Sequence, residues 1–204
     1  MQGAKQSEYL MNEKTISSKT VFKGCLLNVE VLDVETDAGV RCVREIVRHQ
    51  GAVAVLAELP DGRFVFVRQF RKAVEQEMLE IVAGKLEKGE KPEECARREL
   101  KEETGFVCDS LEKMGEIYLT PGYSSERTHL FFARLSPNAG LQRPDDDENL
   151  VVVFHTADEI EDMILRSEIR DAKTLAMWLL FKKKPERRVR DSNKTLIMQH
   201  DEKH

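Results

Sequence analysis

The chain has 204 residues, a formal net charge of −5 and 41% hydrophobic residues. A chain of this length can bury a core without disulfide or metal staples, and its acidic balance argues against nucleic acid as a partner. No window approaches the roughly 20 apolar residues of a membrane span, and the polar N-terminus lacks the apolar stretch of a signal peptide. The four cysteines form neither a CxxC pair nor a zinc-site spacing with histidine. We therefore expect a cytoplasmic protein with free thiols and no membrane partner.

The N-terminal part of the chain divides into two segments. Residues 1–19 are polar, which predicts a loosely held tail. Residues 20–49 carry apolar residues on both sides of a turn at Asp37-Ala38-Gly39, which predicts an antiparallel β arm.

Residues 50–185 carry the signals of one larger domain, and residues 186–204 form a charged tail. Residues 52–57 are a continuous apolar run that is typical of a buried central strand. Pro92 in a first turn and Gly105 at a C-cap position predict a helix over residues 92–104. The remaining predicted elements are strands at 64–67, 78–82, 111–119, 128–135 and 150–155, and two helices between 157 and 184. This order predicts the α/β (α+β) class, with a mixed sheet covered by helices.

Three carboxylates fall on one face of the helix predicted over residues 92–104. At about 100° per residue, Glu99, Glu102 and Glu103 lie within an arc of roughly 100°. Ala96 and Leu100 lie on the adjoining side, where they can pack the helix on the sheet. Carboxylates gathered in this way repel one another, and a hard divalent cation such as Mg²⁺ relieves that repulsion.

Two neighbouring residues support this interpretation. Arg98 lies at the edge of the same stripe, where it can pin a carboxylate. Gly84 allows a close approach of the preceding loop, so a backbone carbonyl there can also reach a cation. The alternative for residues 98–103 alone is a solvated helix held by ion pairs, of which Glu94 with Arg98 is an example.

The segment from Gly84 to Phe106 resembles the Nudix box GX5EX7REUXEEXGU and matches it at every fixed position. The similarity extends over most of residues 20–180 and, within the superfamily, is to the ADP-ribose pyrophosphatases. The segments that carry it are 43–49, 67–71, 79–87, 120–126, 145–148 and 171–174. The resemblance implies a Nudix fold, an α/β/α sandwich with a mixed sheet, preceded by the N-terminal antiparallel arm. Pro121 stands 121 − 105 = 16 residues after the box glycine, where this family marks ADP-ribose specificity.

The resemblance also implies the metal ligands and catalytic residues. Glu99 and Glu103 correspond to the chief ligands, joined by Glu102, by the Ala83 carbonyl and by Glu148 of an acidic loop over residues 145–148. The implied catalytic residues are Glu103, Asp146, Glu148 and Arg98. Asp146 stands where many relatives have a catalytic glutamate, so Asp146 and Glu126 are both candidates for the general base.

Substrate contacts follow from the same resemblance. The implied contacts are Arg44, Arg71, Glu80, Gly84, Pro121, Gly122 and Glu126. Arg44 and Arg71 lie among apolar residues of predicted strands, where a charged side chain is uncommon unless it has a partner or a function. The family places them near the phosphates or the terminal ribose of the substrate. The alternative is that they are edge-strand arginines paired with nearby glutamates.

The function implied is the Mg²⁺-dependent hydrolysis of ADP-ribose to AMP and ribose 5-phosphate by attack of a metal-activated water, with Mn²⁺ as a possible substitute. The runner-up is a hydrolase of GDP-mannose or another nucleoside-diphosphate sugar, because the box reads only the diphosphate. A non-catalytic Nudix ligand sensor is a remote alternative, since sensors usually carry a DNA-binding extension or a degraded box. The resemblance further implies a homodimer in which the β arm contributes to the partner's site.

Overall fold

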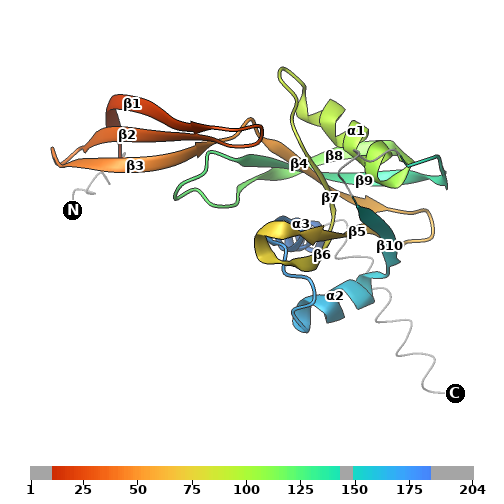
Figure 1. Cartoon of the computed structure of the whole chain (residues 1–204). Helices are drawn as coiled ribbons and strands as arrows, with labels where there is room; N and C mark the ends of the chain where they lie inside the picture. The colour runs from red at the N-terminus through yellow and green to blue at the C-terminus, as the bar shows by residue number, and fades with distance from the viewer. Residues whose placement is uncertain (1–10, 143–148, 185–204) are drawn as a thin grey trace, which may run out of the picture. The chain divides into compact units, whose positions relative to one another are not determined.

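The computed structural model describes residues 11–142 and 149–184, which form two compact units (Figure 1). The first unit contains the described residues up to His49 together with Thr120–Glu126. The second unit contains Gln50–Leu119 and the described residues from Arg127 onward. In the described part of the chain, no helix is both long and apolar enough to cross a bilayer.

The first unit is built on an antiparallel sheet in the order β1-β2-β3. Its strands are β1 (Glu13–Lys23), β2 (Asn28–Thr36) and β3 (Arg41–Arg48). Gly39, with φ 76°, supplies the left-handed residue that the tight turn between β2 and β3 requires. The end of β3 is joined to the segment Thr120–Glu126 by a bridge between Val47 and Ser124.

The start of the first strand differs from the sequence prediction. Residues 1–19 were expected to form a polar tail, but β1 begins at Glu13. The strand pairs with β2 from Glu13↔Thr36 to Lys23↔Asn28, and all of its residues are exposed. A strand with no buried face shows no alternation of apolar and polar residues in the sequence, which is why the prediction was wrong here.

The second unit contains a mixed sheet of seven strands. Its main path runs β10-β5-β4-β9-β8, with β6 paired to β5 and β7 paired to β4. The parallel pair is β4 with β9, and the other pairs are antiparallel. The strands are β4 (Ala52–Glu58), β5 (Phe64–Arg71), β6 (Gln76–Glu80), β7 (Val82–Lys85), β8 (Phe106–Tyr118), β9 (Arg127–Ala139) and β10 (Leu150–His155). A short 3₁₀ turn, η1 (Lys72–Val74), lies between β5 and β6.

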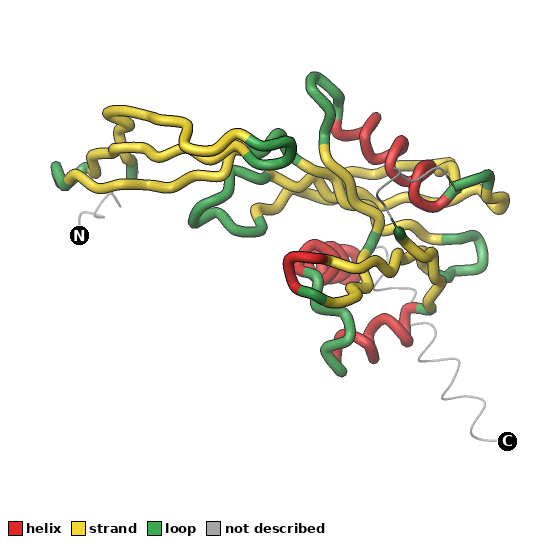
Figure 2. The backbone as a smooth tube through the Cα atoms, viewed as in Figure 1, coloured by secondary structure: helices red, strands yellow, loops and turns green. Residues whose placement is uncertain are grey.

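Helices cover both faces of this sheet, which confirms the predicted α/β/α arrangement (Figure 2). The helices are α1 (Pro92–Thr104), α2 (Ala157–Leu165) and α3 (Ala172–Lys183). The central strand β4 is buried on both sides, as its apolar run predicts. Val53 and Val55 join the core under α1, whereas Ala54 and Leu56 join the core shared with α2 and α3.

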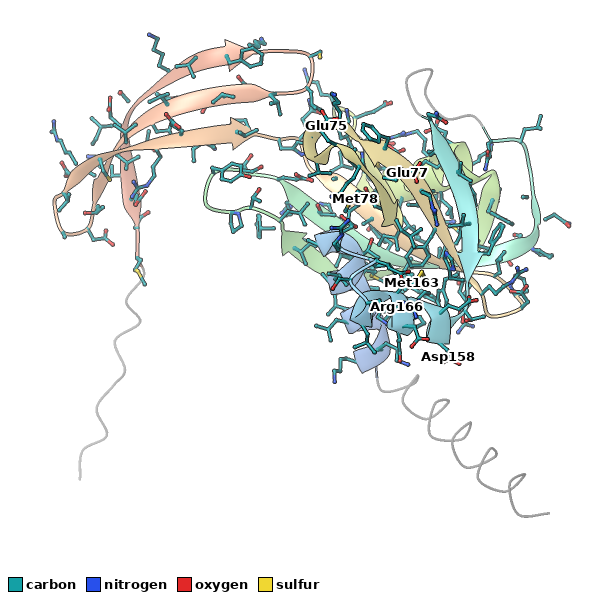
Figure 3. The ribbon with its side chains drawn as sticks, turned by 60° about the horizontal axis from the view of Figure 1, so that its bottom comes forward. Glu75, Glu77, Met78, Asp158, Met163 and Arg166 are labelled. Atoms are coloured by element: carbon teal, nitrogen blue, oxygen red, sulfur yellow. The ribbon has the colours of Figure 1, made fainter. Side chains whose placement is uncertain are left out.

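The cores explain how α2 is oriented. Met163 is buried in the cluster beneath α2 and α3, whereas Asp158 on the same helix and Arg166 at its C-cap are exposed (Figure 3). The helix begins at a capping box: the Thr156 side chain accepts from the Glu159 N–H, and the Glu159 carboxylate accepts from the Thr156 N–H.

The predicted helix over residues 92–104 is confirmed at both ends. It begins at Pro92 and is closed by Gly105 with φ 74°. A Cβ on Gly105 would lie 2.5 Å from the Gly140 carbonyl oxygen, so only glycine fits there. In contrast, β8 begins at Phe106 rather than at residue 111, and irregularities in its pairing with β9 span this first part.

The sheet divides at the junction of β6 and β7, which the sequence predicted as one strand over residues 78–82. β4 pairs with β7 along Ala52–Val55 and with β5 only at Ala57 and Glu58. Ile81, 1% exposed, separates β6 from β7. The chain therefore changes its pairing partner immediately before Ala83 and Gly84.

Candidate functional site

The helix α1 presents its charged stripe as the sequence predicts. Cys95, Ala96 and Leu100 are buried in the core beneath the helix. Lys101 and Glu94 face solvent. The remaining stripe consists of Arg98, Glu99, Glu102 and Glu103.

Arg98 is the centre of this stripe. Its Nε and Nη2 donate to the two carboxylate oxygens of Glu90 at 2.9 and 3.0 Å. Its Nη1 donates to Glu99 and to Glu102, each at 2.9 Å. The sequence predicted that Arg98 pins a carboxylate, and the structure shows it holding three of them.

Glu90 is the functional residue of the box that the sequence reasoning left without a role. The hydrogen bond from Arg98, opposed by partial desolvation and assisted by the Glu87 N–H, lowers the pKa of Glu90 to about 2. The same pairing raises the pKa of Arg98 above its already high value. Glu90 is therefore a fixed anion that orients the guanidinium, and its place in the motif was the signal for this.

Gly84 is required by the position of Glu99. It pairs with Val53 in the sheet, so its backbone is fixed. A Cβ on Gly84 would lie 1.8 Å from the carboxyl carbon of Glu99. Only glycine at this position leaves room for the Glu99 carboxylate to lie against β7.

The three carboxylates differ in burial. Glu103 is 1% exposed, Glu99 is mostly buried, and Glu102 is half-exposed. The pKa of Arg71 is raised chiefly by its hydrogen bond to Glu80 and to a smaller degree by the charge of Glu103. The buried carboxylate of Glu103 thus lies within electrostatic range of Arg71.

The donors of this stripe suit a hard divalent cation by type. They are carboxylate oxygens beside a glycine backbone that lets Glu99 approach, and Mg²⁺ prefers oxygen ligands. Among the described residues, no three acidic, histidine or cysteine side chains converge as a closed metal site does. Two of the carboxylates are instead turned to Arg98.

Arg71 and Glu80 form a second polar group in this unit. Arg71 Nε and Nη2 donate to the Glu80 oxygens at 2.7 and 2.8 Å. Arg71 therefore has a glutamate partner, although it does not lie on an edge strand as the alternative predicted, because β5 lies between β10 and β4. Glu80 also accepts from Lys173, which the sequence reasoning did not assign to the site.

The other predicted substrate residues lie in the first unit. Arg44 is paired with Glu13, with 2.5 Å between Nη2 and Oε1, as the edge-strand alternative predicted. Pro121 and Gly122 are exposed, and Glu126 is half-buried. Asp146 and Glu148 lie outside the described residues, so their roles stay predictions from the sequence.

Comparison with known proteins places this geometry in a family. Residues 48–178 match the model of the NUDIX domain. An ADP-ribose pyrophosphatase of Bacillus subtilis is 43% identical over 165 residues, which cover 80% of this chain and 89% of that protein. A methanol dehydrogenase activator of Bacillus methanolicus is 42% identical over 81% of this chain and 90% of its own length.

Two further matches have lower sequence identity to this chain. A GDP-mannose pyrophosphatase of Yersinia enterocolitica is 34% identical over 78% of this chain and 87% of that protein. The crystal structure of an ADP compounds hydrolase superposes with a TM-score of 0.75 and 27% sequence identity. It covers 87% of this chain and 96% of that structure.

Proposed function

The chain belongs to the NUDIX domain family, and on this basis we propose that it is a hydrolase that cleaves ADP-ribose to AMP and ribose 5-phosphate. The relative that is 43% identical over most of both chains is named an ADP-ribose pyrophosphatase. The structural match is to an enzyme named for ADP compounds. Both names support a substrate with an adenosine diphosphate portion.

The observation that carries the proposal is the carboxylate stripe ordered by Arg98. An ion-paired surface helix would need neither the bidentate Glu90–Arg98 pair nor a glycine at position 84. In this chain both features fix the position of Glu99. The carboxylates of this helix are therefore held in place by neighbouring residues and are not simply exposed to water.

We propose that Mg²⁺, with Mn²⁺ as a substitute, is held by Glu99 and Glu103, with Glu102 and the Ala83 carbonyl as further ligands. A divalent cation bound there neutralises charge on the diphosphate and lowers the pKa of a water molecule. Glu148 is proposed as an additional ligand from the sequence.

The protein's own residues supply orientation and proton transfer. Arg98 holds the carboxylates of Glu99 and Glu102 through its Nη1, which limits the conformations that the two side chains can adopt before substrate arrives. We propose that Arg71 donates to a phosphate oxygen of the substrate. Asp146 and Glu126 are the two candidates to accept the proton of the attacking water.

A second candidate substrate is GDP-mannose, because a relative 34% identical is named a GDP-mannose pyrophosphatase. The two substrates share the diphosphate that the box would engage and differ in base and sugar. Release of the nucleoside monophosphate should be measured over a panel of ADP-ribose, GDP-mannose and other nucleoside-diphosphate sugars, with and without EDTA. We expect ADP-ribose to give the highest kcat/KM and EDTA to abolish turnover. A clear preference for a guanine or uridine sugar would reject ADP-ribose as the substrate.

Glu103→Gln tests the ligand assignment. We expect turnover of ADP-ribose to fall by several orders of magnitude while the fold persists, because the charge on a buried ligand is removed and its shape is kept. Glu94→Gln is the matched control, since it makes the same change on the exposed side of α1 and should leave kcat unchanged. Wild-type activity in Glu103→Gln would overturn the assignment.

A further inference from the structure

The start of α3 is fastened to the junction of β6 and β7 by two adjacent residues. Thr174 Oγ1 accepts from the Ile81 N–H at 3.1 Å, and Lys173 donates to the Glu80 carboxylate. Asp171 caps the helix by accepting from the Thr174 N–H at 3.0 Å, and it also accepts from Lys173 at 2.9 Å. Lys173 and Thr174, neighbours at the start of α3, thus hold Glu80 at the end of β6 and Ile81 directly after it.

The four charges at this junction form a balanced group with one end at the surface. Glu80 and Asp171 are the anions, and Arg71 and Lys173 are the cations. Side-chain exposure is 2% for Glu80, 11% for Lys173 and 13% for Asp171, but 43% for Arg71. The three buried side chains therefore support Arg71, and Arg71 is the one that a ligand in solution can reach.

The support fixes the orientation of the Arg71 guanidinium. Its Nε and Nη2 are both used on Glu80, in the fork geometry that locks the plane of the group. Among the described residues, Nη1 makes no hydrogen bond. The charge of Glu103 acts on this guanidinium, so it belongs to the neighbourhood of the carboxylate stripe.

We propose that Lys173 is a positioning residue that holds the buried carboxylate of Glu80, so that Arg71 presents its Nη1 edge to an anionic oxygen of the substrate. The inference rests on the proposed function, which takes a diphosphate as substrate. It also gives a role to residues 171–174, which carry part of the family resemblance but had no predicted role.

Physical chemistry makes Lys173 necessary for this arrangement. Burial opposes the ionisation of Glu80, and the cations Arg71 and Lys173 outweigh it, so the pKa of Glu80 is below its usual value. Without Lys173, a carboxylate almost fully removed from water keeps one cation, and that cation is half-exposed. Glu80 would then turn or take up a proton, and Arg71 would lose its fixed orientation.

The test compares Lys173→Met, Lys173→Arg and Lys182→Met in steady-state hydrolysis of the panel substrate that the wild type turns over best. Lys182→Met is the matched control, because it removes a lysine that pairs with Glu161 at 2.9 Å at the other end of α3. Lys173→Met should raise KM about tenfold or more and change kcat little, since a contact made in both ground and transition states is weakened. Lys173→Arg should keep KM within a few-fold of the wild type, and Lys182→Met should match the wild type.

The link through Glu80 is tested by a double variant. Glu80→Gln should itself raise KM, and adding Lys173→Met to it should raise KM little further, because the charge that Lys173 holds is already gone. Glu80→Gln also serves if Lys173→Met does not fold. An unchanged KM in Lys173→Met or in Glu80→Gln, or a full additional effect in the double variant, overturns the inference. A wild type that hydrolyses none of the panel rejects the proposed function instead.

Discussion

Single residues of the box hold one another in place. Glu90 fixes Arg98, and Arg98 in turn fixes Glu99 and Glu102. Gly84 has no side chain, and the Glu99 carboxyl group lies in the space that a Cβ would fill. Each of these residue types is therefore required by a neighbour, which explains how so short a segment can constrain so many positions.

Gly84→Ala is expected to abolish most activity. The new Cβ would occupy the space of the Glu99 carboxyl group, 1.8 Å from its carbon, so Glu99 must leave its position. Gly62→Ala is a suitable control, because Gly62 has φ 86° and open space around it, so it suffers backbone strain without a clash. Both variants should be assayed for AMP release and thermal unfolding. Equal activity in the two would contradict the steric role of Gly84.

Glu90→Gln is expected to lower stability in a manner that depends on pH. The folded-state pKa of Glu90 is about 2 and its ordinary value is 4.5. A depressed pKa contributes stability above the unfolded-state value, and that contribution is lost as the pH falls toward the folded-state value. The wild type should therefore exceed Glu90→Gln in Tm at pH 7, and the difference should shrink as the pH falls from about 4.5 toward 2. Circular dichroism melts at several pH values, with Glu94→Gln as the control, measure this; a difference independent of pH would refute it.

At the scale of elements, the caps decide where the helices start. Thr156→Ala removes one half of the capping box of α2 and should destabilise the protein by about 1 kcal/mol. For a chain of this size that is a decrease of roughly 2–4 °C in Tm. Thr156→Ser keeps the hydroxyl acceptor and should stay close to the wild type. If serine and alanine at this position melt together, the cap contributes nothing.

Elements with strong local signals could be predicted from the sequence. The helix α1 has proline at its start and glycine after its end, and β4 is an unbroken apolar run. The carboxylate stripe followed from helical geometry alone. These features depend on neighbours a few residues apart, which a sequence displays directly.

Features held by distant partners could not be predicted. β1 consists of exposed residues and exists because β2 pairs with it. The contact of Lys173 with Glu80 joins residues 93 positions apart, and no local pattern announces it. The segments 79–87 and 171–174 both resemble the family in sequence, but only the fold shows that the second supports the first.

At the scale of the whole molecule, the first unit exposes several large apolar side chains. Those 40% or more exposed are Met11, Ile16, Val21, Phe22, Leu26, Leu27, Val40, Val43 and Tyr123. Contact with another chain is one role of exposed apolar side chains that form a contiguous patch. A second copy is the partner that the family resemblance implies.

We therefore expect a homodimer that uses the first unit. Light scattering coupled to size exclusion should give a mass of twice the 23.4 kDa of the chain. Phe22→Glu, which places a charge among these apolar residues, should shift the mass toward that of the monomer. Leu165→Glu is the control, since Leu165 is 82% exposed on α2 of the second unit and should leave the dimer intact. A wild type that is monomeric at assay concentrations would contradict the dimer. Dissociation by Leu165→Glu but not by Phe22→Glu would move the interface to the second unit.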